Sequence, residues 1–246
     1  IIFWGLGSDG TVGANKNSIK IIGNTTDLYC QAYFVYDSKK AGGLTQSHLR
    51  FGKEPIRSPY LVRSADFVSC QNSTYVNKYD MLNDLKEGGT FLLNCAWNKT
   101  ELEKHLPASM KRAFAAKNIN FYTINATEIA LKLGLNNRTN TILQAAFFKL
   151  TEIIPLDQAI QEMADAISST YSKKGQAIVD MNNASIKYGI SELRKVDVPE
   201  SWLTAEDAPL ELNLPPFIQE VVVPMNRQTG DLLPVSVMKK YGLEDG

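Results

Sequence analysis

Cysteine and histidine are scarce in this 246-residue chain, and neither forms a recognisable functional pattern. The three cysteines, Cys30, Cys70 and Cys95, lie far apart and make no C-x-x-C pair. This spacing argues against an iron–sulfur cluster or a structural zinc site and favours buried free thiols. The two histidines, His48 and His105, belong to no H-E-x-x-H or H-x-x-E-H motif, and no serine sits in a nucleophile elbow. We therefore expect no catalytic residue and no metal site, so that the chain alone catalyses nothing.

The chain also lacks a surplus of either charge and any long apolar run. Lys and Arg number 26, Asp and Glu number 26, and the formal net charge is zero. A balanced chain has no global attraction to nucleic acid or to an anionic membrane, so any anion site has to be local. No apolar stretch approaches the ~20 residues of a membrane span, and none resembles a signal peptide. We expect a cytoplasmic protein without nucleic-acid or membrane partners.

Strand-like and helix-like runs alternate along the chain, which is typical of an α/β fold. After a first apolar run, the expected strands are residues 28–36, 44–51, 60–62, 66–70, 90–94 and 120–124. The expected helices are residues 15–23, 75–85, 99–117 (interrupted at Pro107), 126–133, 140–153, 156–171 and 176–196. Three strands between residues 28 and 62 leave no room for crossover helices and so predict an antiparallel excursion.

These elements predict a Rossmann-like three-layer α/β domain with a mixed, mostly parallel sheet and a helical C-terminal half. Six of the ten prolines occur from Pro199 onward. Such proline density is typical of an extended segment that runs over a surface. We therefore expect one domain over residues 1–199 and an extended, Pro-rich connector over residues 200–246.

A glycine-dense turn links the first apolar run to a helix-competent stretch. Gly5, Gly7 and Gly10 fit G-x-G-x-x-G, in the order strand, turn, helix that this motif needs. Glycines let the backbone approach a phosphate closely, and the first N–H groups of the next helix point at it. The turn therefore predicts a phosphate site, although glycines that merely tighten a strand–helix turn would give the same pattern.

A dinucleotide site needs an acid at the end of the second strand. Asp37 is placed for that role, but it follows Gly10 by 27 positions where about 20 is usual. Lys39 and Lys40 come next, and two lysines suit a ligand with an extra phosphate, such as NADP or coenzyme A. A Walker A loop is excluded because the chain has no G-x-x-x-x-G-K-[ST].

Long segments spread over nearly the whole chain carry a family resemblance. They are GLGSDGTVGANKNSIK (residues 5–20), YFVYDSKKAGG (33–43), SHLRFGKEPIR (47–57), LPASMKR (106–112), QAAFF (144–148) and GDLLPVS (230–236). In these segments the chain resembles the pyruvate:ferredoxin (flavodoxin) oxidoreductase family. Within that family it is similar to domain III, the gamma-type 2-oxoacid oxidoreductase domain, with the connector toward the ferredoxin-like domain.

The resemblance implies an activity that is shared among several domains. Such enzymes cleave pyruvate on thiamine diphosphate with Mg, pass electrons through 4Fe-4S clusters to ferredoxin or flavodoxin, and transfer the acetyl group to coenzyme A. Thiamine diphosphate, Mg and the clusters are implied on other domains only, and the full enzyme is implied to be a homodimer. Domain III is implied to bind coenzyme A as a substrate.

The coenzyme A contacts implied by the resemblance are Ser8, Asp9, Gly10, Thr11 and Val12 in the loop, with Lys40, Asn140 and Asn182. The loop N–H groups would cradle phosphate, and the lysine would add a point charge. The two asparagines can both donate and accept hydrogen bonds, as the pantetheine amides or the adenine require. We add Arg138 as a further phosphate partner, because a guanidinium binds phosphate bidentately.

Two other interpretations remain open from the sequence. The same domain could be a structural or interaction module that has no ligand of its own, although such a module has no need of the Lys39-Lys40 pair beside a glycine loop. A free-standing NAD(P)-binding dehydrogenase domain is the third interpretation. The Pro-rich connector and the lack of any substrate-domain chemistry count against it.

Overall fold

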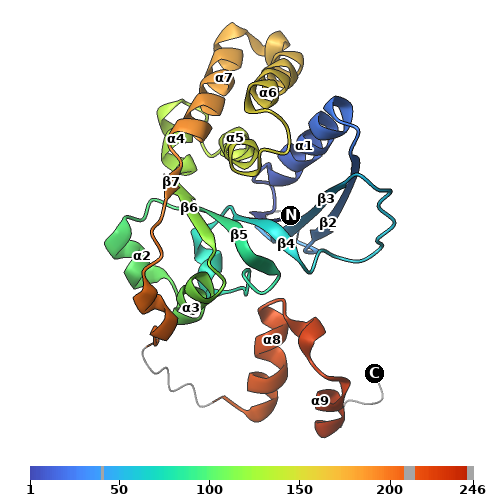
Figure 1. Cartoon of the computed structure of the whole chain (residues 1–246), viewed down its shortest axis with the longest axis vertical. Coiled ribbons are helices and arrows are strands. Elements are labelled where there is room, and N and C mark those ends of the chain that lie inside the picture. The colour runs from blue at the N-terminus through green and yellow to red at the C-terminus, as the bar shows by residue number, and fades with distance from the viewer. Residues whose placement is uncertain (40–41, 208–213, 243–246) are drawn as a thin grey trace.

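A seven-stranded sheet forms the centre of the computed structural model, which describes residues 1–39, 42–207 and 214–242 (Figure 1). The strands occur in the order β2-β3-β1-β4-β5-β6-β7. Their bounds are β1 (Ile2–Leu6), β2 (Tyr29–Tyr36), β3 (Leu44–Gly52), β4 (Ala65–Cys70), β5 (Leu85–Asn94), β6 (Asn120–Ile124) and β7 (Arg194–Lys195). The predicted α/β class and mixed sheet are confirmed.

Four parallel strands form the middle of the sheet, and antiparallel strands flank them. β1, β4, β5 and β6 run parallel, whereas β3 pairs antiparallel with both β1 and β2, and β7 with β6. The predicted antiparallel excursion is therefore confirmed for β2 and β3. The third expected strand, residues 60–62, is wrong, because these residues form a loop after β3.

Helices cover both faces of the sheet and complete three layers (Figure 1). One face carries α1 (Thr11–Thr25), α4 (Ala126–Lys132), α5 (Asn140–Thr151), α6 (Leu156–Tyr171) and α7 (Gln176–Ser191). The other face carries α2 (Lys99–His105) and α3 (Ala108–Ala116). Each face has its own apolar core, one around Phe147 of α5 and the other around Phe91 of β5 and Phe114 of α3. No described helix combines the length and apolarity needed to cross a bilayer.

The break between α2 and α3 follows from local sequence. Asn98 and Glu101 form a capping box at the start of α2, in which each side chain bonds the other residue's backbone N–H. Pro107 then precedes α3 and cannot continue the first helix, because its ring blocks the preceding turn. The predicted interruption at this proline is confirmed.

The helix expected over residues 75–85 is wrong. Only a short 3-10 turn (Ser73–Asn77) forms there, and β5 begins at Leu85. The Lys117 Nζ donates to the carbonyls of Leu82, Asn83 and Leu85 at 2.6–3.1 Å. A lysine 32 or more residues further on thus satisfies carbonyls of this segment and fixes its irregular backbone.

The connector is less extended than its prolines predict. The connector begins with a 3-10 turn (Glu200–Thr204), which packs on the preceding domain and is counted with it here as the body, residues 1–204. Trp202 of this turn is buried, and its Nε1 donates to Glu103 at 2.6 Å. Residues 214–242, here called the tail helices, include a π-helical turn (Ile218–Val222), α8 (Val223–Asn226) and α9 (Val235–Lys240). Pro234 is compatible with this structure because it precedes α9, where no N–H is needed, whereas Pro224 follows the π-helical turn inside one helical run, residues 216–226. Residues 208–213 lie outside the described residues, and the boundary after residue 199 stays a prediction.

Candidate ligand-binding site

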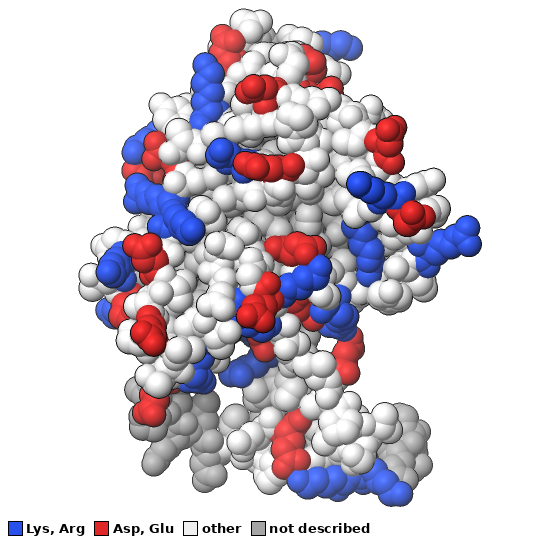
Figure 2. All heavy atoms as spheres, in the orientation of Figure 1, with Lys and Arg blue, Asp and Glu red and all other residues white. Residues whose placement is uncertain are grey.

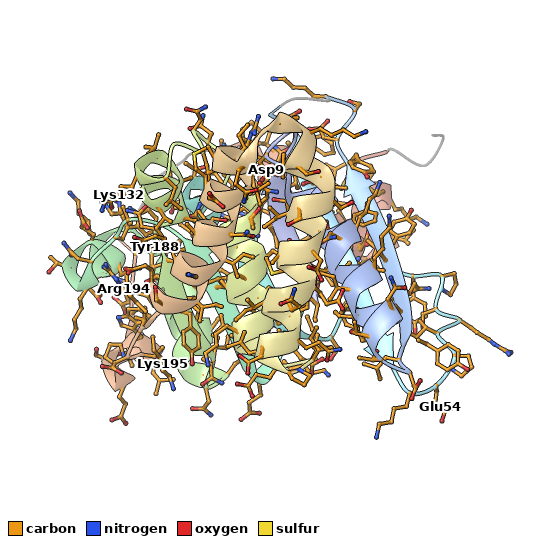
Figure 3. The ribbon with its side chains drawn as sticks, turned by 90° about the horizontal axis from the view of Figure 1, so that it is seen from above. Asp9, Glu54, Lys132, Tyr188, Arg194 and Lys195 are labelled. Carbon is orange, nitrogen blue, oxygen red and sulfur yellow. The ribbon has the colours of Figure 1, made fainter. Side chains whose placement is uncertain are left out.

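The glycine turn lies at the carboxyl end of the central parallel strands, where it joins β1 to α1. From β1 the chain continues to β2 on one side of the sheet, and β4 lies on the other side of β1. Open α/β sheets bind ligands at the point where the order of the strands reverses in this way. Figure 3 shows Asp9 of this turn and Glu54, which follows β3, at opposite ends of the sheet.

The Asp9 carboxylate fixes the shape of the turn. Its Oδ2 accepts the N–H of Leu6 at 2.8 Å, and its Oδ1 accepts the N–H of Thr11 at 2.8 Å. These bonds join the last residue of β1 to the first residue of α1. Asp9 therefore acts through its side chain as a brace, and a ligand would meet its backbone.

The N–H groups available to an anion lie one step further into α1 than Thr11. The Thr11 N–H is committed to Asp9, whereas Val12 and Gly13 follow in the first turn of the helix. Amides of a first turn have no carbonyl partner within their helix, and the helix dipole makes this end positive. The turn thus keeps the chemistry of an anion site even though a carboxylate braces it.

Asn140 lies directly against the turn, although it is 130 positions away from Gly10 in the sequence. Gly10 adopts a left-handed backbone with φ of 89°, and a Cβ built there would lie 3.1 Å from the Asn140 Cγ. Asn140 is the first residue of α5. The amino ends of α1 and α5 therefore meet at Gly10, which explains why a residue with a side chain would not fit there.

A cavity of about 440 Å³ opens beside the turn. Its walls come from the turn, the start of α1, β3 and the end of β2. They are formed by Leu6, Gly7, Ser8, Asp9, Gly10, Val12, Tyr36, Asp37, Ser38, Lys39 and Thr45. Thr45 is buried, at 6% exposed, and its Oγ1 has no hydrogen-bond partner among the described residues. Tyr36 is 56% exposed and forms part of the cavity wall.

The predicted site residues fall into three groups. Loop residues 8–12 and Asn140 are brought together, as described above. Arg138 is exposed just before α5, and Asn182 is 4% exposed in α7, where its Nδ2 donates to the Ile178 carbonyl at 2.8 Å. Like Thr11 and Asn140, these two are not among the described residues that line the cavity, and unlike them they are not in the turn or against it. Lys40 lies outside the described residues.

Tyr36 and Thr45 line the cavity but are not among the residues predicted from the sequence. Both stand in ordinary strand sequence, and their relation to the turn comes from sheet register. Thr45 pairs with Gly5 on one side and with Tyr36 on the other. The one available signal was that Tyr36 directly precedes the Asp37-Ser38-Lys39 stretch.

Asp37 does not occupy the position of a ribose-binding acid. Its Oδ1 accepts the Lys39 N–H at 3.2 Å and the Ser38 hydroxyl at 3.3 Å, so it organises its own turn. In the dinucleotide fold the acid-bearing strand lies next to the first strand. Here β3 lies between β1 and β2, which moves Asp37 outward by a strand spacing of about 5 Å.

The histidines and cysteines lie outside this cavity. Burial lowers the pKa of His48 to about 4, and its Nδ1 accepts the Val62 N–H at 3.2 Å. His105 stacks on Trp97 with ring centroids 4.9 Å apart. Burial raises the pKa of the Cys70 thiol to about 12, and all three cysteines are free. Within the described ranges, no group of three or more His, Cys, Asp or Glu side chains is placed to hold a metal.

The visible surface carries both charges in alternation. Figure 2 shows Lys and Arg interspersed with Asp and Glu over this face of the molecule, without a broad field of one sign. Positive charge at the cavity comes from Lys39 in its wall. The electrostatics of the site are therefore local, as the balanced composition predicts.

Comparison with known families decides the relationship of the chain. A family model described as pyruvate ferredoxin/flavodoxin oxidoreductase matches residues 1–192. The chain belongs to this family. A second model, described as a domain of unknown function, matches residues 204–246.

Curated members of the pyruvate ferredoxin/flavodoxin oxidoreductase family are similar over nearly the whole chain. The pyruvate-flavodoxin oxidoreductase of Enterobacter agglomerans is 58% identical over 245 residues, and the pyruvate:ferredoxin oxidoreductase of Moorella thermoacetica is 51% identical over 243 residues. These matches cover 99% and 98% of this chain but 21% of each relative. The chain thus spans about a fifth of the length of these enzymes.

Solved structures share the fold. The pyruvate oxidoreductase subunit PORC of Thermotoga maritima matches with a TM-score of 0.63 and 20% identity, over 80% of this chain and 97% of that subunit. The 2-oxoglutarate:ferredoxin oxidoreductase of Magnetococcus marinus, solved with 2-oxoglutarate, coenzyme A and succinyl-CoA bound, matches with a TM-score of 0.58 and 16% identity, over 80% of this chain and 31% of that chain. The family resemblance and the expected fold are both confirmed.

Proposed function

We propose that this chain is the coenzyme A-binding domain of a pyruvate:ferredoxin (flavodoxin) oxidoreductase. The observation that carries the proposal is the meeting of two helix starts, at Thr11 and Asn140, around Gly10 and beside a cavity of about 440 Å³. Helix starts and glycine turns favour phosphate groups, and coenzyme A carries three of them. The Magnetococcus enzyme, which shares the fold, was solved with coenzyme A bound, and this agrees with the proposal.

Each part of the site has a role that its chemistry supports. The amides of Val12 and Gly13 would donate to a phosphate, and the Asn140 amide would donate to or accept from the same ligand. Lys40 would add a positive charge. Asp9 would hold the turn in shape through its bonds to Leu6 and Thr11.

The whole enzyme would oxidise pyruvate and coenzyme A to acetyl-CoA and CO2, with two electrons passing to ferredoxin or flavodoxin. Thiamine diphosphate, Mg and 4Fe-4S clusters would supply carbanion and electron-transfer chemistry from other domains. The role of this domain would be to hold coenzyme A so that its thiol reaches that centre. Positioning of this kind contributes up to ~7–11 kcal/mol to catalysis in favourable systems. We place this domain in a homodimeric assembly with those other domains.

Calorimetric titration with coenzyme A tests the proposal. Lys40→Ala and Asn140→Ala should each weaken binding about 10-fold, because each removes a direct ligand contact worth about 1.4 kcal/mol. Lys20→Ala is the matched control, since Lys20 is an exposed lysine further along α1. Binding by Lys40→Ala and Asn140→Ala that equals the parent would contradict the assigned site.

A structural or interaction module is the second candidate. It is favoured by apolar side chains that the tail helices leave exposed, among them Leu232 at 62% and Val235 at 89%. In the full-length polypeptide such a module would make no contact with coenzyme A, and Lys40→Ala and Asn140→Ala would leave the KM for coenzyme A unchanged. The same titration therefore separates the two functions.

A further inference from the structure

The cavity beside the turn has an aromatic wall that phosphate contacts do not use. Tyr36 ends β2, lines the cavity and is 56% exposed. The register places Tyr36 opposite Thr45, and Thr45 opposite Gly5. Directly paired residues point to the same face of a sheet, so Tyr36 lies on the face that α1 covers at Gly5. An exposed ring thus flanks the start of α1 across one intervening strand.

Thr45 lies between the ring and the turn and has an unused polar group. It is 6% exposed, lines the cavity, and its Oγ1 has no hydrogen-bond partner in the described part of the chain. A Cβ built on Gly5 would lie 2.8 Å from this oxygen, which places the hydroxyl directly over β1. This oxygen is itself buried against β1 and the Thr11 side chain, so Thr45 shapes the floor between the turn and the ring.

The cavity therefore offers two chemistries in one row. N–H groups at the start of α1 suit a phosphate, and the Tyr36 ring suits a flat base. Lys39, in the same wall, suits a second phosphate. Two strand spacings, about 10 Å, separate β1 from β2, and a ribose can span this distance between a base and its phosphates.

We propose that this cavity takes the adenine nucleotide end of coenzyme A, with the adenine stacked on Tyr36. The assignment rests on the proposed function and adds to it the part of the ligand that the cavity selects. Tyr36 is then a specificity-determining residue for the nucleotide, and the pantetheine arm leaves the cavity toward the rest of the enzyme. A ligand without the nucleoside gains nothing from this ring.

The test compares three variants in the full-length polypeptide that carries this chain. Tyr36→Ala removes the ring, Tyr36→Phe keeps it, and Tyr33→Ala is the matched control. Tyr33 is on the same strand and is 54% exposed, but it points to the opposite face and is not among the described residues lining the cavity. Calorimetric probes are coenzyme A, adenosine 3′,5′-bisphosphate and 4′-phosphopantetheine.

Tyr36→Ala should weaken coenzyme A and adenosine 3′,5′-bisphosphate by roughly 10-fold, a typical effect of losing one base–aromatic stack. It should leave 4′-phosphopantetheine unchanged, and Tyr36→Phe and Tyr33→Ala should bind all three probes as the parent does. In steady state the KM for coenzyme A should rise while kcat stays constant, because the ring contacts the substrate away from its thiol.

Two results would overturn the stacking assignment. Tyr36→Ala could bind coenzyme A as the parent does while Asn140→Ala loses affinity, which keeps the site but removes the ring from it. Alternatively, Tyr36→Ala could weaken 4′-phosphopantetheine as much as coenzyme A, which would make the ring a support for the turn. If Asn140→Ala, Lys40→Ala and Tyr36→Ala all bind as the parent does, the proposed function itself fails.

Discussion

The body and the tail helices differ in how far they bury their large apolar side chains. In the body, Phe67, Phe91, Phe114, Phe121, Phe147 and Phe148 are each at most 2% exposed. In the tail helices, Val221 is 5% exposed, whereas Met225, Leu232 and Val235 are 56%, 62% and 89% exposed. A cavity of about 1280 Å³ lies between the two parts, with walls that include α3 and α8, and the Arg63–Asp231 ion pair joins them.

This difference shows where the chain supplies its own stability. The body closes two cores on itself, one on each face of the sheet. The tail helices present apolar side chains that the described residues do not cover, and the family relatives are about five times as long. Burying such side chains gains about 25 cal/mol per Å² of apolar surface, so further domains of the enzyme would stabilise the tail helices. Substitutions in the two parts should therefore differ strongly in their effect.

Removal of a body phenylalanine should give the largest effect. Phe147 is fully buried, and its ring centroid lies 5.3 Å from that of Phe3 and 5.5 Å from that of Phe67. Phe147→Ala leaves a cavity in this cluster and should lower the free energy of unfolding by about 3–5 kcal/mol. Urea unfolding followed by circular dichroism measures it. A loss below about 1 kcal/mol would mean that the body is not held together by its core.

The pH dependence of stability should also come from the body. Burial lowers the pKa of His48 from 6.5 to about 4, so between these values the unfolded chain takes up a proton that the folded chain does not. The free energy of unfolding should therefore fall as the pH falls from 6.5 to 4, by about 3 kcal/mol in total. His48→Asn keeps an acceptor at the Nδ1 position for the Val62 N–H and removes this titration. Urea midpoints at pH 7 and pH 4 should show a smaller loss in the variant, and equal losses would rule out the assignment.

The junction between the two parts should give an intermediate effect. Glu103 accepts the Trp202 Nε1–H at 2.6 Å and the Lys111 Nζ at 2.7 Å, and both bonds lower the pKa of its carboxyl. Glu103→Gln weakens both bonds at a side chain that is 57% exposed, so the loss should be about 1 kcal/mol. Tryptophan fluorescence during unfolding measures it. Glu206 is an exposed acid in the connector, and Glu206→Gln should leave the free energy of unfolding unchanged. An equal loss in that variant would point to net charge as the cause.

A tail substitution should give the smallest effect in the 246-residue chain. Val235→Ser replaces a side chain that is 89% exposed, so the free energy of unfolding should change by less than about 0.5 kcal/mol. In the full-length polypeptide the same substitution should be destabilising, because a covered valine loses apolar burial. Thermal unfolding of both proteins tests this, and equal midpoint shifts in both would end the contrast between body and tail helices.

Local patterns in the sequence predicted most of the elements, because helix periodicity and strand composition are read over short windows. The break at Pro107 and the antiparallel hairpin of β2 and β3 follow from neighbours in the chain. Residues 75–85 did not follow, because contacts from distant parts of the chain fix their irregular backbone, among them the bonds of Lys117 to the Leu82 and Leu85 carbonyls. The proline-rich connector did not follow either, because proline suits a helix start as well as an extended segment.

A glycine turn at the end of the first strand, with helix amides for an anion, is predictable from residues 5–13 alone, since both are local properties. The surroundings of that turn depend on how distant segments pack. Insertion of β3 between β1 and β2 brings Thr45 and Tyr36 to its side, and the packing of α5 brings Asn140 against Gly10. Strand pairing and helix packing join residues that are distant in the chain, and no local pattern encodes such a meeting.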